Sequence, residues 1–164
     1  ALDRRQRQMC IRDRYNSINF FVVIKMAYWL LKSEPGTWSW DDQLKKGNEG
    51  EGWDGVRNYQ ASNNMKKMEI GDLAFFYHSV NEKSIVGIVS IIEKYQDDPT
   101  DKTGRFGMVV VKAIKSFTKS VSLSEIKSNQ KLQGILLIKQ SRLSVMPITK
   151  EHWDIILEMG ETSI

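Results

Sequence analysis

Residues 53–78 begin with Trp53-Asp-Gly-Val-Arg-Asn-Tyr-Gln-Ala-Ser-Asn-Asn-Met-Lys-Lys-Met68 and, after Gly71-Asp72, end in Leu73-Ala-Phe-Phe-Tyr-His78. They combine aromatic rings, amides, a guanidinium and an imidazole within about one helix and one strand. Aromatic faces stack on flat heterocycles, and amides and backbone groups pair with the edge of such a ring. The stretch therefore predicts a helix–strand unit that holds a ligand such as a nucleobase.

The helix of this unit is predicted from its apolar spacing. Ala61, Met65 and Met68 fall on one face at helical periodicity, so the helix should begin near Asn58–Gln60. The first turn of a helix carries unpaired N–H groups and a partial positive charge, which favour an acceptor-rich ligand. Asp72–His78 then reads as a strand.

The remaining elements predict an α+β fold. Strands at irregular spacing, with helices inserted early, between strands and at the end, argue against a doubly wound parallel sheet. We expect a small mixed or antiparallel β-barrel with flanking helices. The other predicted strands are 28–32, 85–92, 106–117 and 135–138, with an edge segment at 141–147, and the other helices follow the caps Ser39, Ser122 and Thr149.

The charge of the chain is unevenly distributed. The formal net charge is +4, but residues 1–25 carry six basic and two acidic residues, so 18 of each sign remain in residues 26–164. A neutral domain of this size binds nucleic acid through a local patch and a pocket rather than through a broad basic surface. No apolar run approaches the ~20 residues that span a bilayer, so we expect no membrane association.

The N-terminal segment, residues 1–25, is expected to be a non-native or disordered extension of a single domain at 26–164. Its stretch Arg4–Arg14 resembles translated adapter sequence, which would make Met26 the native start. The alternative is a basic arm that contacts phosphate. Cys10, the single cysteine, lies in this segment, so disulfides and thiolate metal sites are not expected in the domain.

Four segments are candidate ligand contacts, and each has a structural alternative. Trp53, held between glycines, is either a pocket wall or a core residue under a loop. Residues 57–60 are either a pocket edge or a capped helix start. Residues 77–79 end a strand, where a lone histidine is usually a hydrogen-bonded structural residue. Arg142 either binds a phosphate or carboxylate or is a solvated surface residue.

Enzyme signatures are weak. The sequence contains no H-E-x-x-H, P-loop or G-x-G-x-x-G motif, and neither histidine has a metal-binding context. We therefore expect no catalysis, no metal and no cofactor. A hydrolase that uses Lys32, Glu34 or His78 remains the alternative.

Several motifs together resemble the EVE domain family. They occur in family order between Met26 and about Met159 and comprise Tyr28-Trp-Leu-Leu-Lys-Ser-Glu-Pro35, Trp53-x-Gly-Val-Arg-Asn-Tyr-Gln-Ala61, Gly71-Asp72, Phe76-Tyr-His-Ser79, Val86-Gly-Ile88 and Ser141-Arg-Leu-Ser-Val-x-Pro147. The resemblance implies a PUA-like bent barrel and a relationship to YTH domains. In those domains a loop tryptophan that corresponds to Trp53 forms part of a cage around a methylated base. Ser62 departs from the family, because many members have an arginine there that could hold phosphate.

The resemblance implies a non-catalytic module that reads a modified base, with modified cytosine in DNA favoured over RNA. The alternative is an RNA-binding or RNA-processing PUA-like module. We expect a monomer, cytoplasmic in a bacterium or nuclear in a eukaryote. The predicted phosphate contacts are Lys66 and Lys67, and the predicted ligand contacts are Lys32, Ser33, Glu34, Trp53, Arg57, Asn58, Tyr59, Gln60, Tyr77, His78, Ser79, Arg142, Leu143 and Ser144.

Overall fold

The computed structural model describes residues 25–164. The expectation for the N-terminal extension therefore lies, except for Lys25, outside the described residues. Within residues 25–164, no helix is long and apolar enough to cross a membrane.

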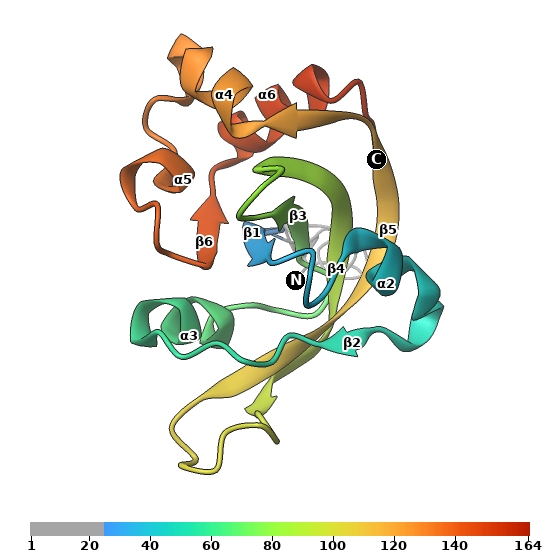
Figure 1. The fold of residues 1–164 in the computed structure, drawn as a ribbon, viewed down its shortest axis with the longest axis vertical. Coiled ribbons are helices and arrows are strands. Elements are labelled where there is room, and N and C mark those ends of the chain that lie inside the picture. Colours follow the sequence, from blue (N-terminus) through green and yellow to red (C-terminus); the bar gives the residue numbers. More distant parts are fainter. Residues whose placement is uncertain (1–24) are drawn as a thin grey trace, which may run out of the picture.

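The core of the fold is a strongly curved mixed sheet (Figure 1). β1 pairs in parallel with β3, and every other pairing is antiparallel. Register shifts interrupt the long β4–β5 ladder, and such bulges increase the local twist and bend the strands. The strands are β1 (Tyr28–Ser33), β2 (Glu51–Gly52), β3 (Leu73–His78), β4 (Ser84–Asp97), β5 (Gly107–Ser122) and β6 (Val145–Ile148), in the order β2-β5-β4-β3-β1-β6.

The structure confirms the predicted α+β class and the PUA-like architecture. The sheet is curved like a barrel, but its strand order does not return on itself. β2 and β6 are its two edges, so the sheet is open between them.

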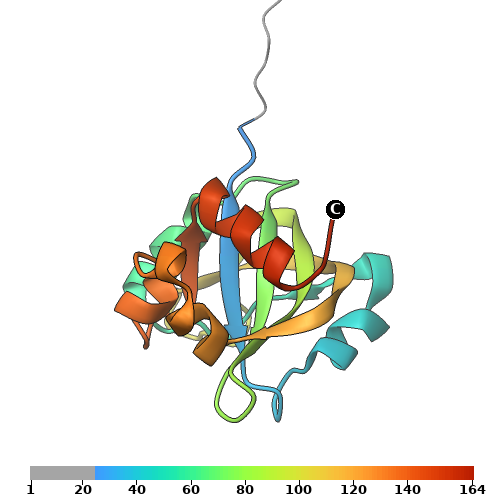
Figure 2. The ribbon, with the colours of Figure 1, turned by 90° about the horizontal axis from the view of Figure 1, so that it is seen from above.

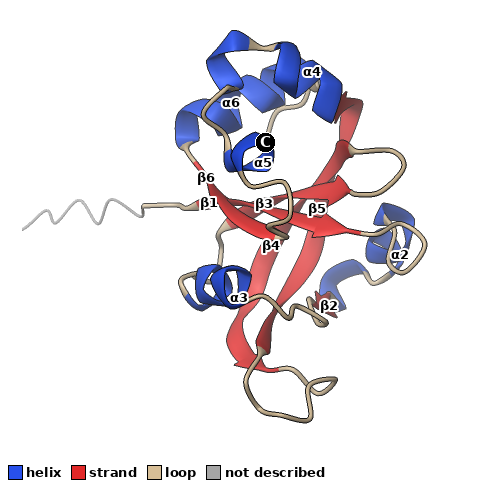
Figure 3. Cartoon of the chain, turned by 60° about the vertical axis from the view of Figure 1, so that its left-hand side comes forward, coloured by secondary structure: helices blue, strands red, loops and turns tan. Residues whose placement is uncertain are grey.

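The helices cover the sheet from two sides. α4, α5 and α6 gather at one end near β6, and α2 and α3 lie toward the other (Figure 3). Seen from above, α6 lies across the first end (Figure 2). The helices are α2 (Trp40–Lys45), α3 (Tyr59–Lys66), α4 (Leu123–Ser128), α5 (Leu136–Lys139) and α6 (Lys150–Met159), with 3₁₀ turns at Gly47–Glu49 and Gln130–Leu132.

The helix starts predicted from sequence agree with the observed caps. The side chains of Ser39 and Ser122 each accept a hydrogen bond from the third helical residue, and both complete a capping box. Asn58 caps α3 and Thr149 caps α6 in the same way, through a single side-chain bond.

Strand β3 is buried on both of its faces, which explains its continuous apolar sequence. Phe75 stacks on Trp153 of α6, with ring centroids 3.9 Å apart. The next residue, Phe76, points the other way and meets Trp40 and Trp53 edge to face. Because successive side chains of a strand point to opposite faces, β3 packs on the C-terminal helix through one face and on the segment around Trp53 through the other.

The Gly71-Asp72 motif has a structural role at the start of β3. Asp72 is 4 % exposed, and its carboxylate accepts hydrogen bonds from the indole of Trp29 at 3.0 Å, from the backbone of Glu69 at 3.0 Å and from the backbone of Ala27 at 3.3 Å. A buried carboxylate with three donors is satisfied, and it connects β1 to the turn before β3.

Two segments differ from the sequence-based expectation. Ile135–Ile138, predicted as a strand, is mostly helical, because α5 spans Leu136–Lys139. A four-residue apolar run has no periodicity that separates a strand from a buried turn of helix. Conversely, Glu51–Gly52, for which no strand was predicted, pairs with β5, and the backbone N–H of the next residue, Trp53, donates to the carbonyl of Val109 at 2.7 Å.

Candidate functional site

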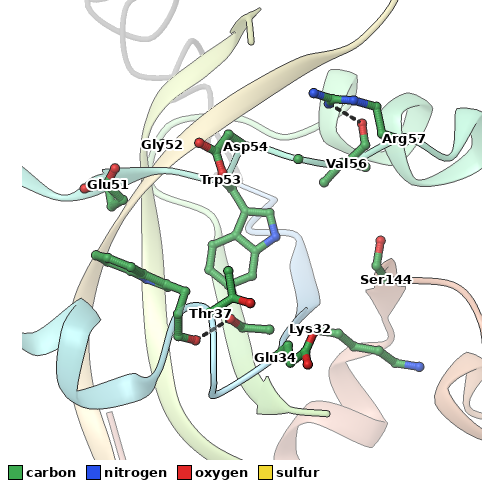
Figure 4. A pocket seen from close by; sticks show the side chains of 13 residues that line it. Lys32, Glu34, Thr37, Glu51, Gly52, Trp53, Asp54, Val56, Arg57 and Ser144 are labelled. Atoms are coloured by element: carbon green, nitrogen blue, oxygen red, sulfur yellow. Dashed lines mark hydrogen bonds between the residues drawn. The ribbon is translucent and has the colours of Figure 1, made fainter. Parts of the chain in front are cut away.

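A cavity of about 510 Å³ opens beside Trp53 (Figure 4). This volume lies in the range of small-molecule sites. One wall comes from the end of β1 and the turn that follows it, and the other comes from β2 and the loop that leads to α3. The lining residues are Lys32, Ser33, Glu34, Thr37, Trp38, Glu51, Gly52, Trp53, Asp54, Gly55, Val56, Arg57 and Ser144.

The indole of Trp53 is held firmly but not fully enclosed. Its side chain packs edge to face on Phe76 at 5.5 Å, and the residue is only 7 % exposed. Among residues 25–164 no group accepts a hydrogen bond from its Nε1, yet this nitrogen is not a buried unsatisfied donor. The N–H group therefore reaches solvent on the cavity side, where it is available to a ligand acceptor.

A second indole lines the same cavity. Trp38 follows the turn after β1, and its Nε1 donates to Gln43 at 3.0 Å, so its ring is fixed in place. The hydroxyl of Ser33 donates to the carbonyl of Trp38 at 2.5 Å and closes that turn. Sequence analysis did not single out Trp38, which lies two residues after Ser33-Glu-Pro-Gly36, because the direction of this turn depends on the tertiary structure.

Arg57 is positioned by an aspartate that sequence reasoning missed. Its guanidinium donates to Asp98 and to Thr100, each at 2.9 Å, and Asp98 also accepts from the backbone of Gly55 at 2.9 Å. Burial alone would raise the pKa of Asp98, but the hydrogen bonds from Thr100, Arg57 and Gly55 outweigh it and lower the pKa to about 2. The carboxylate is charged at neutral pH. It holds both ends of the segment from Gly55 to Arg57 in place at the cavity rim.

The rim carries acidic groups as well as Lys32 and Arg57. Glu34, Glu51 and Asp54 all line the cavity. Partial burial, with the nearby charges of Asp98 and Glu51, raises the pKa of Asp54. The cavity is therefore rich in hydrogen-bond acceptors, and two of them, Glu51 and Asp54, were not among the contacts predicted from the sequence.

Lys32 lies between this cavity and a second, shallower one. Burial lowers its pKa, and its ammonium donates to the carbonyl of Ser141 at 2.7 Å. The second cavity, of about 300 Å³, takes Ser141 into its lining together with Asn58, Gln60, Lys139, Gln140, Arg142 and Leu143.

The predicted contact residues thus fall into three groups. Lys32, Ser33, Glu34, Trp53, Arg57 and Ser144 line the main cavity, and Asn58, Gln60, Arg142 and Leu143 line the shallower one. The remainder lie outside both linings. Tyr59 is 62 % exposed, Lys66 and Lys67 are exposed at the end of α3, and Tyr77, His78 and Ser79 end β3.

Residues at the end of β3 hydrogen-bond to segments next to the cavity and hold them in place. His78 is 7 % exposed, its Nε2 accepts the backbone N–H of Trp40 at 3.0 Å, and its Nδ1 lies 2.7 Å from Glu82. This network assigns the proton to Nδ1 and occupies both nitrogens. Ser79 donates through its backbone to the carbonyl of Ser33 at 2.9 Å and so fixes the end of β1.

These features together define a PUA-like protein with an indole-walled cavity at the end of its first strand. Within this class the chain belongs to the EVE domain family, whose family model matches residues 27–159.

Relatives and solved structures agree with this assignment. Thymocyte nuclear protein 1 of Gallus gallus is 34 % identical over 170 residues, which cover 84 % of this chain and 70 % of that protein. The NMR structure of a Rhodopseudomonas palustris protein is 48 % identical, with a TM-score of 0.79 over 83 % of this chain and 94 % of that one. The crystal structure of human THYN1 in complex with 5-methylcytosine-containing DNA is 30 % identical, with a TM-score of 0.76 over 84 % and 99 % of the two chains.

Proposed function

We propose that this EVE domain is a non-catalytic reader of a modified base, with modified cytosine in DNA as the favoured ligand. The base is turned out of its helix and held in the cavity beside Trp53. The proposal is supported by the human relative, whose structure is a complex with 5-methylcytosine-containing DNA. It rests on one observation about this chain, the open space beside an ordered indole whose N–H has no partner among residues 25–164.

The indoles supply the affinity for a flat ring. Stacking of a base on an aromatic side chain contributes ~1–3 kcal/mol. Trp53 and Trp38 both line the cavity and both are fixed, by Phe76 and Gln43 respectively. Because these rings are ordered before binding, little side-chain entropy is lost when a base enters.

The acceptors at the rim select which base edge is read. Cytosine and adenine carry an exocyclic amino group, which is a hydrogen-bond donor. Glu34, Glu51 and Asp54 can accept from such a group, and the indole N–H of Trp53 can donate to a ring carbonyl. The set matches cytosine, which carries both an exocyclic amino group and a ring carbonyl, better than adenine, which has no carbonyl, or thymine, which has no amino group.

The phosphate contacts lie outside the main cavity. We assign them to Arg142 in the shallower cavity and to Lys66 and Lys67 at the end of α3. Three cations on a domain whose formal net charge is zero give limited electrostatic affinity. Turning a base out of the helix costs a few kcal/mol, so an isolated domain should bind modestly.

The test compares duplexes that differ in one base. The protein is titrated with duplexes that carry cytosine, 5-methylcytosine or 5-hydroxymethylcytosine at one position, and with the matching single-stranded RNAs. We expect tighter binding to one of the modified DNAs. Equal weak binding to every duplex would refute the reader function, and a preference for unmodified RNA would favour the RNA-binding alternative.

Substitution of Trp53 separates stacking from hydrogen bonding. Trp53→Phe keeps an aromatic face but removes the N–H donor, and Trp53→Ala removes both. We expect an intermediate loss of affinity for the first and a loss of about five- to 150-fold for the second. Thermal unfolding of both variants checks that the fold is retained. If Trp53→Phe folds and neither its affinity nor its base preference changes, the indole N–H is not a base contact.

A further inference from the structure

An aromatic pair, in which one ring is exposed and the other partly buried, lies next to the cavity rim. Tyr59, the first residue of α3, is 62 % exposed. Its ring centroid lies 4.9 Å from that of Phe106, and the two planes are inclined by 38°. Phe106 precedes β5 at the end of the long β4–β5 hairpin, which extends away from the body of the protein (Figure 1).

Arg57 joins this pair to the cavity. It belongs to the cavity lining, and its guanidinium carbon lies 5.8 Å from the centroid of the Phe106 ring. Its bonds to Asp98 and Thr100 hold it in that position. The pair is therefore an ordered surface that is continuous with the cavity rim, and a cation adjoins it.

The same face of α3 continues with polar groups. Asn63 and Lys66 follow Tyr59 at four and seven residues, which places all three on one side of the helix, and all three are exposed. Lys66 lies about 10 Å further along the axis. An aromatic ring followed by an amide and a cation is the arrangement that tracks a nucleic-acid strand, because bases stack while cations approach phosphates.

We propose that Tyr59 and Phe106 form a second stacking site, which receives the nucleobase next in sequence to the one held in the cavity. This inference deepens the proposed function and depends on it. The strand would cross the rim at Arg57, with one base beside Trp53 and its neighbour against the open face of Tyr59. Stacking is tolerant of base identity, so this site adds affinity without adding sequence preference.

A thermodynamic cycle tests the contact directly. Duplexes carry 5-methylcytosine with either a normal nucleotide or an abasic residue on its 5′ side, and a second pair carries the same change on its 3′ side. Each is titrated against the wild-type protein and Tyr59→Ala. The abasic residue also alters the cost of turning out the methylated base, but this effect is equal for both proteins and cancels in the cycle.

On one of the two sides, the wild-type protein should lose about five- to 150-fold in affinity when the flanking base is removed. Tyr59→Ala should bind both duplexes of that pair with the weaker affinity, whereas Tyr59→Phe should behave as the wild type. Alanine is favourable in a helix and the side chain is exposed, so the fold should be retained. Ile70→Ala, which truncates a side chain that is 63 % exposed, is the matched control and should change nothing.

The outcomes separate this proposal from the function on which it rests. If Tyr59→Ala and the wild type lose equal affinity on both sides while the preference for 5-methylcytosine persists, the second site is refuted and the reader function stands. If the wild type shows no preference for a modified base, both fail. A concentration-dependent dimer that Tyr59→Ala abolishes would assign the surface to a second copy of the chain and overturn the proposal.

Discussion

Asp98→Asn should lower the free energy of unfolding by an amount that depends on pH. The carboxylate of Asp98 is inaccessible to solvent and accepts hydrogen bonds from Arg57, Thr100 and Gly55. Its pKa is about 2, below the ordinary value of 3.8. Since each pKa unit corresponds to about 1.36 kcal/mol, the charged form contributes roughly 2 kcal/mol to folding. Arg57 is 40 % exposed and partly screened, which reduces the expected contribution to about 1–2 kcal/mol.

The sign of the pH dependence follows from the depressed pKa. A group whose pKa is lower in the folded state stabilises the protein above its unfolded pKa of about 3.9, and this contribution is lost as the pH falls through the folded value. The difference in unfolding free energy between the wild type and Asp98→Asn should therefore be constant from pH 7 to about pH 5. Between about pH 4 and pH 2 it should shrink, because the wild-type carboxylate becomes protonated.

Urea unfolding at pH 7, 5, 4, 3 and 2 measures this difference. Asp97→Asn is the matched control, because Asp97 is the neighbouring residue and is exposed, so its substitution should cost less than about 0.5 kcal/mol at neutral pH. A difference for Asp98→Asn that does not change between pH 7 and pH 2 would refute the assigned role of the charge. If the fold survives, looser placement of Arg57 should also weaken binding of the modified duplex.

Two further predictions concern the support behind the cavity. Gly87→Ala should destabilise the fold by about 1–3 kcal/mol, since a Cβ there would lie 2.3 Å from the indole of Trp40. Gly134→Ala is the control, because a Cβ at that position would lie 3.9 Å from its nearest neighbour, and equal melting temperatures of the two variants would contradict the argument. His78→Ala should lower the free energy of unfolding, measured by chemical denaturation, by about 1–3 kcal/mol because it leaves the buried N–H of Trp40 without its acceptor. Glu82→Gln alters only the exposed partner of the ring and should cost less; the reverse order would show that the bond to Trp40 is not the one that stabilises the fold.

Local interactions made much of the architecture predictable. Ser39, Ser122, Asn58 and Thr149 cap helices through bonds to residues three positions away, so the signal lies within one short segment. The apolar run of β3 likewise indicated a strand, although only the structure showed that Phe75 and Phe76 pack in two different layers.

The candidate site was only partly predictable. The glycines around Trp53 left a pocket wall and a core residue as alternatives, and in the structure Trp53 lines the cavity while being only 7 % exposed. Trp38 could not be distinguished from the structural tryptophans, because its role depends on where the turn after β1 is directed. Asp98 and its partner Arg57 are 41 residues apart in sequence, so no local pattern links them.

The sequence by itself determined most of the elements and where the capped helices begin, because helix caps, turns and apolar periodicity act between residues a few positions apart. The tertiary structure alone decided which polar groups meet. The bond from Lys32 to Ser141 spans 109 residues, and Ile135–Ile138 forms a turn of helix rather than a strand. Such outcomes depend on how distant segments pack around the bent sheet, and no local pattern of residues encodes that packing.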